Sequence, residues 1–130
     1  MSAEALTFRK HEHLCGQLRI QEVFRTGKGV GEPPFRLVGL RMELPTNAPA
    51  QVAFSVPRKH LRRAVDRNRM KRLMREAYRL NKTGTYARLA ERPGQVAWLL
   101  IYQGRQVIAW EEVERKISRV LARWLNEDAR

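Results

Sequence analysis

The residues best suited to chemistry lie in one basic segment, residues 58–79. This segment holds ten Lys and Arg residues against two acids, so it carries +8 of the chain's net charge of +13. Most of these bases are arginines, whose planar guanidinium groups bind phosphate through paired hydrogen bonds and stack on bases. Asn68, between Arg67 and Arg69, adds an amide that both donates and accepts. The combination is typical of a nucleic-acid site, with an anionic membrane surface as the second candidate.

The spacing of apolar residues predicts an amphipathic helix over residues 65–81. At 100° per residue, one stripe of this helix gathers four apolar side chains, Met70, Leu73, Met74 and Ala77. The opposite side gathers Asn68 with four bases, Lys71, Arg72, Arg75 and Arg79. Residues 59–64 are expected to form a loop, because a longer helix would place Arg62 and Arg63 on the apolar stripe. A solvated helix face is the alternative explanation, but such faces usually alternate acids with bases.

Two further groups of residues raise the question of a metal site. His11, His13 and Cys15 alternate along the chain, but their spacing fits no familiar zinc pattern. Three glutamates within residues 111–114 are explained more simply by a helix start, where carboxylates interact favourably with the helix dipole. No Ser-His-Asp or Cys-His arrangement for nucleophilic catalysis can be argued. The sequence therefore predicts no catalytic residue and no metal bound by the protein.

The remaining pattern predicts a single α+β domain over residues 1–130. The expected order is a flexible arm (1–13), a helix (17–25), a turn-rich connector with room for a very short strand (27–34), strands (35–44 and 51–57), the basic helix, an irregular insertion (82–94), a buried strand (95–104) and a closing helix (111–126). The only cysteine, Cys15, excludes an internal disulfide and fits a reducing compartment. No apolar run approaches the ~20 residues of a membrane span, so a cytoplasmic protein is expected.

The string FSVPRKHLRRAVDRNRMKRLMREAYR, residues 54–79, resembles the protein subunit of bacterial ribonuclease P. The matching parts are Ser55-Val56 followed by Arg58-Lys59, then Arg67-Asn68-Arg69, Lys71-Arg72 and Arg75-Glu76. The residues around the first and last expected helices are similar to that family as well, so the resemblance covers roughly residues 14–126.

This resemblance implies a two-layer α/β sandwich in the order α-β-β-β-α-β-α, with a left-handed βαβ crossover. It also implies a function, the binding of a catalytic RNA and of the 5′ leader of precursor tRNA during endonucleolytic removal of that leader. Catalysis is then expected from the RNA subunit and the Mg²⁺ that it holds, with one protein per RNA. The expected contacts to the RNA subunit are Arg58, Lys59, Arg62, Arg63, Asn68, Arg69, Arg72, Arg75 and Arg79. The expected contacts to the leader are Ile20, Phe24, Val38, Arg67 and Lys71.

Two of the expected leader contacts depart from the family pattern. Ile20 and Val38 are aliphatic where relatives carry aromatic residues, so this chain is expected to hold the leader more by charge than by base stacking. A structural ribosomal protein is the alternative function, with a similar composition and fold. A DNA-binding module is less favoured, because nothing reads as a helix-turn-helix.

Overall fold

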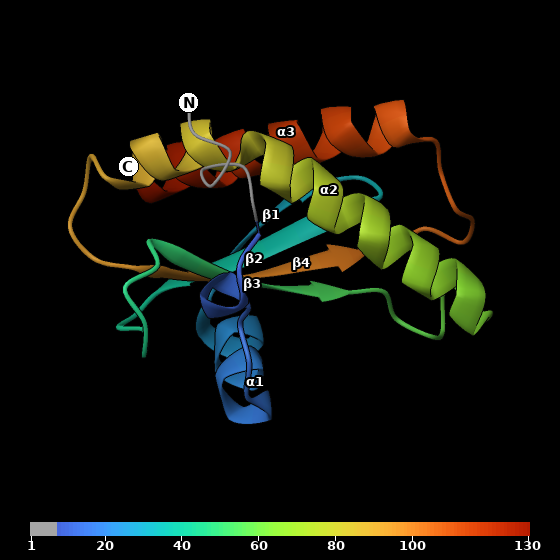
Figure 1. Cartoon of the computed structure of the whole chain (residues 1–130), viewed down its shortest axis with the longest axis horizontal. Coiled ribbons are helices and arrows are strands. Elements are labelled where there is room, and N and C mark those ends of the chain that lie inside the picture. The colour runs from blue at the N-terminus through green and yellow to red at the C-terminus, as the bar shows by residue number, and fades with distance from the viewer. Residues whose placement is uncertain (1–7) are drawn as a thin grey trace.

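The computed structural model describes residues 8–130 and shows a mixed sheet with helices on both faces (Figure 1). Its elements are η2 (Lys10–Glu12), α1 (Gln17–Thr26), β1 (Lys28–Glu32), β2 (Phe35–Arg41), β3 (Ala50–Ser55), α2 (Ala64–Leu89), β4 (Val96–Tyr102) and α3 (Trp110–Asp128). The predicted order α-β-β-β-α-β-α is confirmed, and β1 is the short strand for which the connector had room.

The four strands lie in the order β1-β2-β4-β3. The first three pair antiparallel, whereas β3 pairs parallel with β4. Two parallel neighbours need a long connection, and α2 supplies it across one face of the sheet. Figure 1 shows this connection as the left-handed crossover that the resemblance implied.

The sheet separates a large core from a smaller one. On one side α2 and α3 cover the sheet, and the largest buried side chains there include Trp98, Trp124 and Tyr78. On the other side α1 covers a smaller cluster that includes Val23, Val38 and Leu99. Every residue of β4 is buried, as predicted for a strand covered on both faces.

The predicted irregular insertion at residues 82–94 is wrong for its first part, because α2 runs on to Leu89. Lys82, Thr85 and Leu89 are buried along this extension, at the spacing of one helix face. This buried face was not predicted from the sequence, because two of its three residues, Lys82 and Thr85, are polar.

The predicted flexible arm is also wrong where the structure describes it; residues 1–7 lie outside the described residues. Phe8 packs edge-on against Phe54 and Tyr78, with ring centroids 5.7 and 5.5 Å apart. His13 forms a parallel bridge with Val52, and Leu14 donates its amide to the carbonyl of Val52. Residues 8–14, here called the N-terminal strap, therefore cover the β3 edge of the sheet.

Candidate nucleic-acid interface

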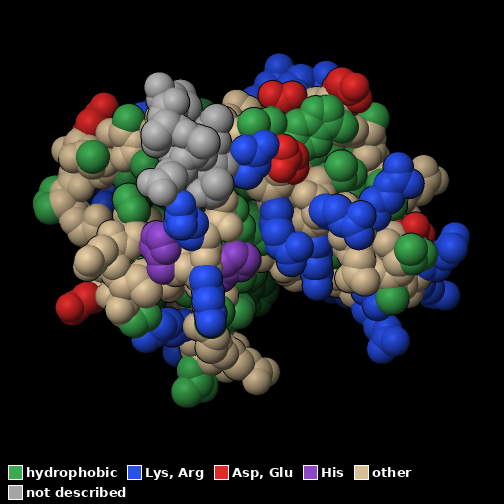
Figure 2. All heavy atoms as spheres, viewed as in Figure 1, with side chains coloured by type: hydrophobic (Ala, Val, Ile, Leu, Met, Phe, Trp, Pro, Cys, Tyr) green, Lys and Arg blue, Asp and Glu red, His purple; other side chains and the backbone are tan. Residues whose placement is uncertain are grey.

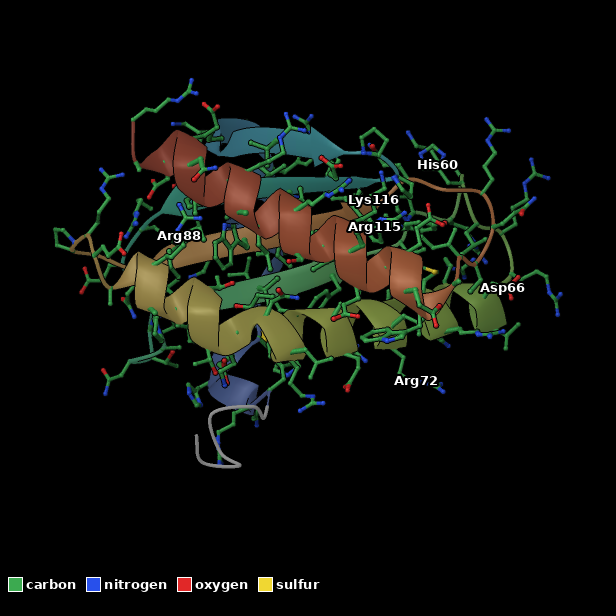
Figure 3. All side chains as sticks on the ribbon, turned by 90° about the horizontal axis from the view of Figure 1, so that it is seen from above. His60, Asp66, Arg72, Arg88, Arg115 and Lys116 are labelled. Carbon is green, nitrogen blue, oxygen red and sulfur yellow. The ribbon has the colours of Figure 1, made fainter. Side chains whose placement is uncertain are left out.

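The basic surface is formed by the loop at residues 57–63 and the first four turns of α2. Eight of the nine residues expected to contact the RNA subunit are exposed there: Arg58, Lys59, Arg62, Arg63, Asn68, Arg69, Arg72 and Arg75. Figure 2 shows Lys and Arg side chains gathered over this part of α2. In Figure 3, Arg72 points away from α3 on the outer side of α2. These residues, with Arg79, are called the basic surface below.

Few acids neutralise the basic surface. Glu76 is bound by Arg79, whose Nη2 lies 2.5 Å from Oε1, and this hydrogen bond lowers the pKa of Glu76. Asp66 lies 3.9 Å from Arg63, at the limit of an ion pair. Among residues 8–130, no acid pairs with Arg69, Arg72 or Arg75. The surface therefore keeps most of its positive charge available for an external anion.

Arg67 holds the loop in place. Its Nη1 donates to the carbonyl oxygens of Leu61, at 3.0 Å, and Arg62, at 2.6 Å. Leu61 is buried, so the loop is anchored to the core between its exposed bases. This anchoring sets the loop bases beside the start of α2.

A cleft of about 260 Å³ lies between α1 and the open part of the sheet. Its lining consists of Phe24, Arg36, Ser55, Pro57, Lys59, His60, Leu99, Ile101 and Gln103. Phe24 is 63% exposed, which is unusual for a large aromatic side chain and leaves its ring available to a ligand. Lys59 and His60 belong both to this cleft and to the loop, so the cleft opens toward the basic surface.

The structure brings only one of the five expected leader residues to this cleft, namely Phe24. Val38 is buried in the small core beneath α1, and Ile20 is half-buried against the same cluster. Arg67 and Lys71 lie on α2, outside the cleft lining. Ile20 and Val38 therefore pack in the small core that holds α1 against the sheet.

Sequence reasoning missed several polar residues of the cleft, including Arg36, His60 and Gln103. A signal for Arg36 was present, because strand alternation places it on the same face as Val38, two residues away. His60 and Gln103 follow the ends of strands that meet at this edge, and their proximity depends on the sheet order.

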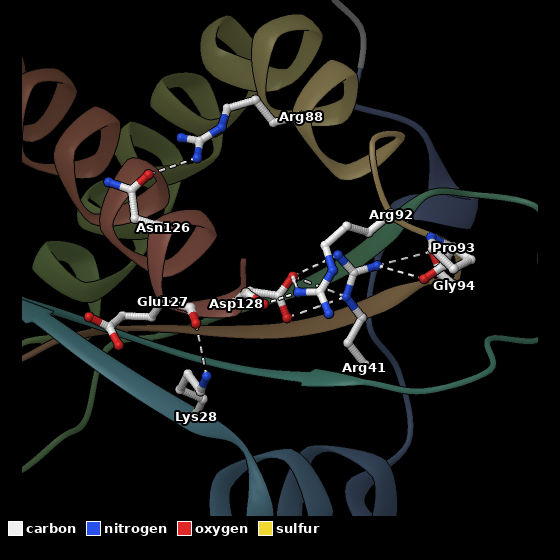
Figure 4. Close-up of polar contacts among 9 residues, drawn as sticks. All are labelled: Lys28, Arg41, Arg88, Arg92, Pro93, Gly94, Asn126, Glu127 and Asp128. Atoms are coloured by element: carbon white, nitrogen blue, oxygen red, sulfur yellow. Dashed lines mark hydrogen bonds and ion pairs between the residues drawn. The ribbon is translucent and has the colours of Figure 1, made fainter. Parts of the chain in front are cut away.

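Two acids, Asp128 and Glu32, are each engaged by more than one base. Asp128 accepts from Arg41 Nη2 at 2.7 Å and lies 3.2 Å from Arg92 Nη1 (Figure 4). Glu32 lies within 3.7 Å of Lys116, Arg119 and Arg123.

Within residues 8–130, no three His, Cys, Asp or Glu side chains come together as a metal site. In the same part of the chain, no helix has both the length and the apolar character needed to cross a membrane.

Comparison with known proteins shows which family the chain belongs to. Residues 8–124 match the family described as Ribonuclease P. The chain belongs to the ribonuclease P protein family. It is 34% identical to the ribonuclease P protein component of Chlorobium phaeobacteroides, over 88% of this chain and 86% of that protein. It is 36% identical to the component of Porphyromonas gingivalis, over 88% of this chain and 83% of that protein.

Solved ribonuclease P proteins share the fold. The protein of Staphylococcus aureus superposes with a TM-score of 0.68 at 18% identity, covering 88% of this chain and 96% of that chain. The protein of Thermotoga maritima superposes with a TM-score of 0.65 at 22% identity, covering 86% and 96%.

Membership of this family makes the chain a component of ribonuclease P, the endoribonuclease holoenzyme of tRNA processing. It also implies an RNA subunit as the partner and decides against the alternative of a structural ribosomal protein.

Proposed function

We propose that the basic surface binds the catalytic RNA of ribonuclease P. The observation that carries the proposal is the row of exposed arginines on α2, Arg69, Arg72 and Arg75, for which the described chain supplies no acid. Like charges this close on one helix reduce its stability, and RNA phosphates would remove that cost. Asn68, in the same row, suits a sugar hydroxyl or a base edge. One protein binds one RNA in this proposal.

The 5′ leader of precursor tRNA occupies the cleft beside Phe24. The exposed ring offers a stacking platform for an unpaired base, and Arg36 and Lys59 supply charge for the phosphates on either side. Since Lys59 also borders the basic surface, a leader in the cleft lies next to the bound catalytic RNA.

Phosphodiester cleavage is assigned to the RNA subunit and to Mg²⁺ bound by that RNA. Protein nucleases usually activate water with metal-bound carboxylates or a positioned base. Here the acids nearest the basic surface, Asp66 and Glu76, face Arg63, at the end of the loop, and Arg79, on α2. The protein contributes by binding substrate and by replacing counterions, which lowers the Mg²⁺ requirement of the holoenzyme.

Reconstitution tests this division of work. The purified protein, freed of RNA by a nuclease that is then inactivated, is expected to cleave no precursor tRNA. Addition of the RNA subunit and Mg²⁺ is expected to restore cleavage at the mature 5′ end. Cleavage that survives removal of the RNA would overturn the proposal, since the active site would then lie in the polypeptide.

A further inference from the structure

The strand β1 leaves part of the sheet without side chains beside the cleft of about 260 Å³ that contains Phe24, here called the leader cleft. Successive residues of a strand point to opposite faces, so Gly29 and Gly31 fall on the same face. Their partners across the ladder are Val38 and Arg36, whose side chains lie on the face that α1 covers and that the leader cleft opens on. At this edge, that face of the sheet is therefore bare backbone.

Arg36 lies flat on this bare backbone. A Cβ atom placed on Gly29 would lie 2.6 Å from Nη2 of Arg36, 3.1 Å from Cζ and 3.6 Å from Nε. These three distances grow more slowly than the bonds along the group, and they place Gly29 over the plane of the guanidinium and not at its edge. A larger side chain at residue 29 would have to displace the group, so the glycine permits this arrangement.

The outer face of the same guanidinium is available to a ligand. Arg36 is exposed and lines the leader cleft. Within residues 8–130, it forms no hydrogen bond and no ion pair. Packing on Gly29 thus holds one face of the group, while its other face and its N–H groups have no partner in the described chain. A planar cation presented in this way is a stacking surface for a nucleic-acid base.

Arg36 belongs to the floor of the leader cleft. It pairs across the sheet with Ile101, which pairs in turn with Ser55, and all three residues line the cleft. Phe24 lines the same cleft from α1, with its ring 63% exposed. The cleft therefore offers an aromatic face on the helix and a cationic face on the sheet, close enough together for neighbouring nucleotides of one strand to reach both.

We propose that Arg36 is a second stacking surface for the 5′ leader, with an unpaired base packed on the outer face of the guanidinium that Gly29 holds against the sheet. The inference rests on the proposed function, because it requires the leader in this cleft. It assigns to Arg36 a contact with a base in addition to its charge, at a place where Ile20 and Val38 offer no ring. Stacking accepts any base, so the contact suits a single strand of any sequence.

Substitutions in the full-length protein separate the plane of Arg36 from its charge. The experiment measures the Kd of the reconstituted holoenzyme for precursor and for mature tRNA. Arg36→Lys keeps the charge and loses the plane, and it is expected to weaken precursor binding about fivefold, the low end for one stacked base, without changing mature tRNA binding. If Arg36→Lys binds precursor tRNA as the parent protein does, charge alone is sufficient and the inference is wrong.

The two glycines provide a matched pair of variants. Gly29→Ala keeps Arg36 but displaces its guanidinium, and it is expected to weaken precursor binding about threefold, part of one stack. Gly31→Ala is the control, because its Cβ would meet no atom within 4 Å, and neither glycine has a positive φ that alanine would resist. Thermal melting checks that both variants fold. Equal weakening by both would assign the loss to the strand and would overturn the role of Arg36.

Leaders with one abasic nucleotide separate a base contact from a phosphate contact, since an abasic nucleotide keeps its phosphate. With the parent protein, the abasic nucleotide at one leader position is expected to weaken binding about fivefold. With Arg36→Lys, the same position is expected to cost nothing further, because the stack is already lost and the two changes are not additive. If every abasic position weakens binding to Arg36→Lys as much as to the parent protein, Arg36 contacts phosphate alone and the inference fails.

Phe24→Ala, measured in parallel, distinguishes failure of this inference from failure of the proposed function. Weaker precursor binding by Phe24→Ala, together with parental binding by Arg36→Lys and Gly29→Ala, would overturn the stacking role of Arg36 and leave the leader in the cleft. Parental binding of precursor tRNA by all three folded variants would overturn both, because the leader would then lie elsewhere.

Discussion

The two halves of α2 differ in whether their basic side chains are exposed or buried. In the first half, Arg69, Arg72 and Arg75 are exposed to solvent. In the second half, Lys82 is 8% exposed, and its Nζ lies 2.7 Å from Oε1 of Glu12 on the N-terminal strap. Glu12 also accepts from the hydroxyl of Tyr86 at 2.6 Å, and Tyr86 shares a hydrogen bond with Tyr78.

The difference shows which charges remain available for a partner. Burial alone would raise the pKa of Glu12, but hydrogen bonds from Lys82 and Tyr86 outweigh it and hold this pKa below its ordinary value. Glu12 therefore stays ionised and fastens the N-terminal strap to α2. Within residues 8–130, no acid pairs with Arg69, Arg72 or Arg75 in the first half of the helix, so their charge is available for an external anion.

The largest expected effect comes from breaking the buried pair. Glu12→Gln removes the carboxylate that lies 2.7 Å from the buried ammonium group of Lys82, and removal of one partner of such a pair costs about 3–5 kcal/mol. Urea unfolding measures this loss, and RNA affinity of the protein that remains folded is expected to be unchanged. Glu22→Gln, an exposed acid on α1, serves as the control and is expected to unfold like the parent protein.

The stabilisation that Glu12 provides is also expected to depend on pH. Because the pKa of Glu12 is lower in the folded protein, its contribution is fully present above the ordinary glutamate pKa of 4.5 and is lost as pH falls through the folded value. The stability gap between the parent protein and Glu12→Gln is thus expected to narrow in acid. A gap of constant size from pH 7 to strongly acidic pH would contradict an ionised Glu12.

In the first half of α2, a single substitution is expected to weaken RNA binding and to leave the stability of the fold nearly unchanged. Arg69→Ala should weaken binding of the RNA subunit by about 1–3 kcal/mol, as expected for one charge-assisted contact, and should leave the unfolding free energy nearly unchanged. Filter binding and urea unfolding measure the two quantities. Arg130→Ala, at the opposite end of the molecule, is the matched control (Figure 1). Equal weakening by both substitutions would indicate general charge attraction.

A smaller effect is expected in the leader cleft. Phe24→Ala removes one stacking platform, and a loss of about 1 kcal/mol is expected, at the low end for a stacked base, because Ile20 and Val38 provide no neighbouring aromatic ring. The loss should appear for precursor tRNA bound to the holoenzyme and not for mature tRNA, which lacks a leader. If the folded variant binds both tRNAs as the parent protein does, the leader lies elsewhere.

The same contrast explains what could be predicted from the sequence. The basic surface was predictable because its pattern is local: Met70, Met74 and Ala77 repeat on one face of the helix and the arginines on the other. The part of α2 beyond residue 81 was not, because the partner of Lys82 is 70 residues away in the chain. A polar residue whose burial depends on so distant a partner reads as part of a loop.

Some residues of the candidate site could be predicted from the sequence, and others could not. Phe24 was expected from the resemblance alone, since an exposed aromatic and a core aromatic have the same helical pattern. His60 and Gln103 meet in the cleft only because β3 and β4 are neighbours in the sheet, which no local pattern reveals. Arg67 was expected as a leader contact, and its bonds to the loop backbone could not be predicted because they follow from the loop conformation.

The salt dependence of RNA binding tests the central claim most directly. If the basic surface neutralises about six phosphates, the slope of log K against log salt concentration should be near −5, at about 0.7–0.9 per phosphate. The triple variant Arg69→Ala, Arg72→Ala, Arg75→Ala should then give a slope of about −2 to −3, since three contacts are lost. A slope that is flat in the parent protein, or that stays the same in the triple variant, would contradict RNA binding through the first half of α2.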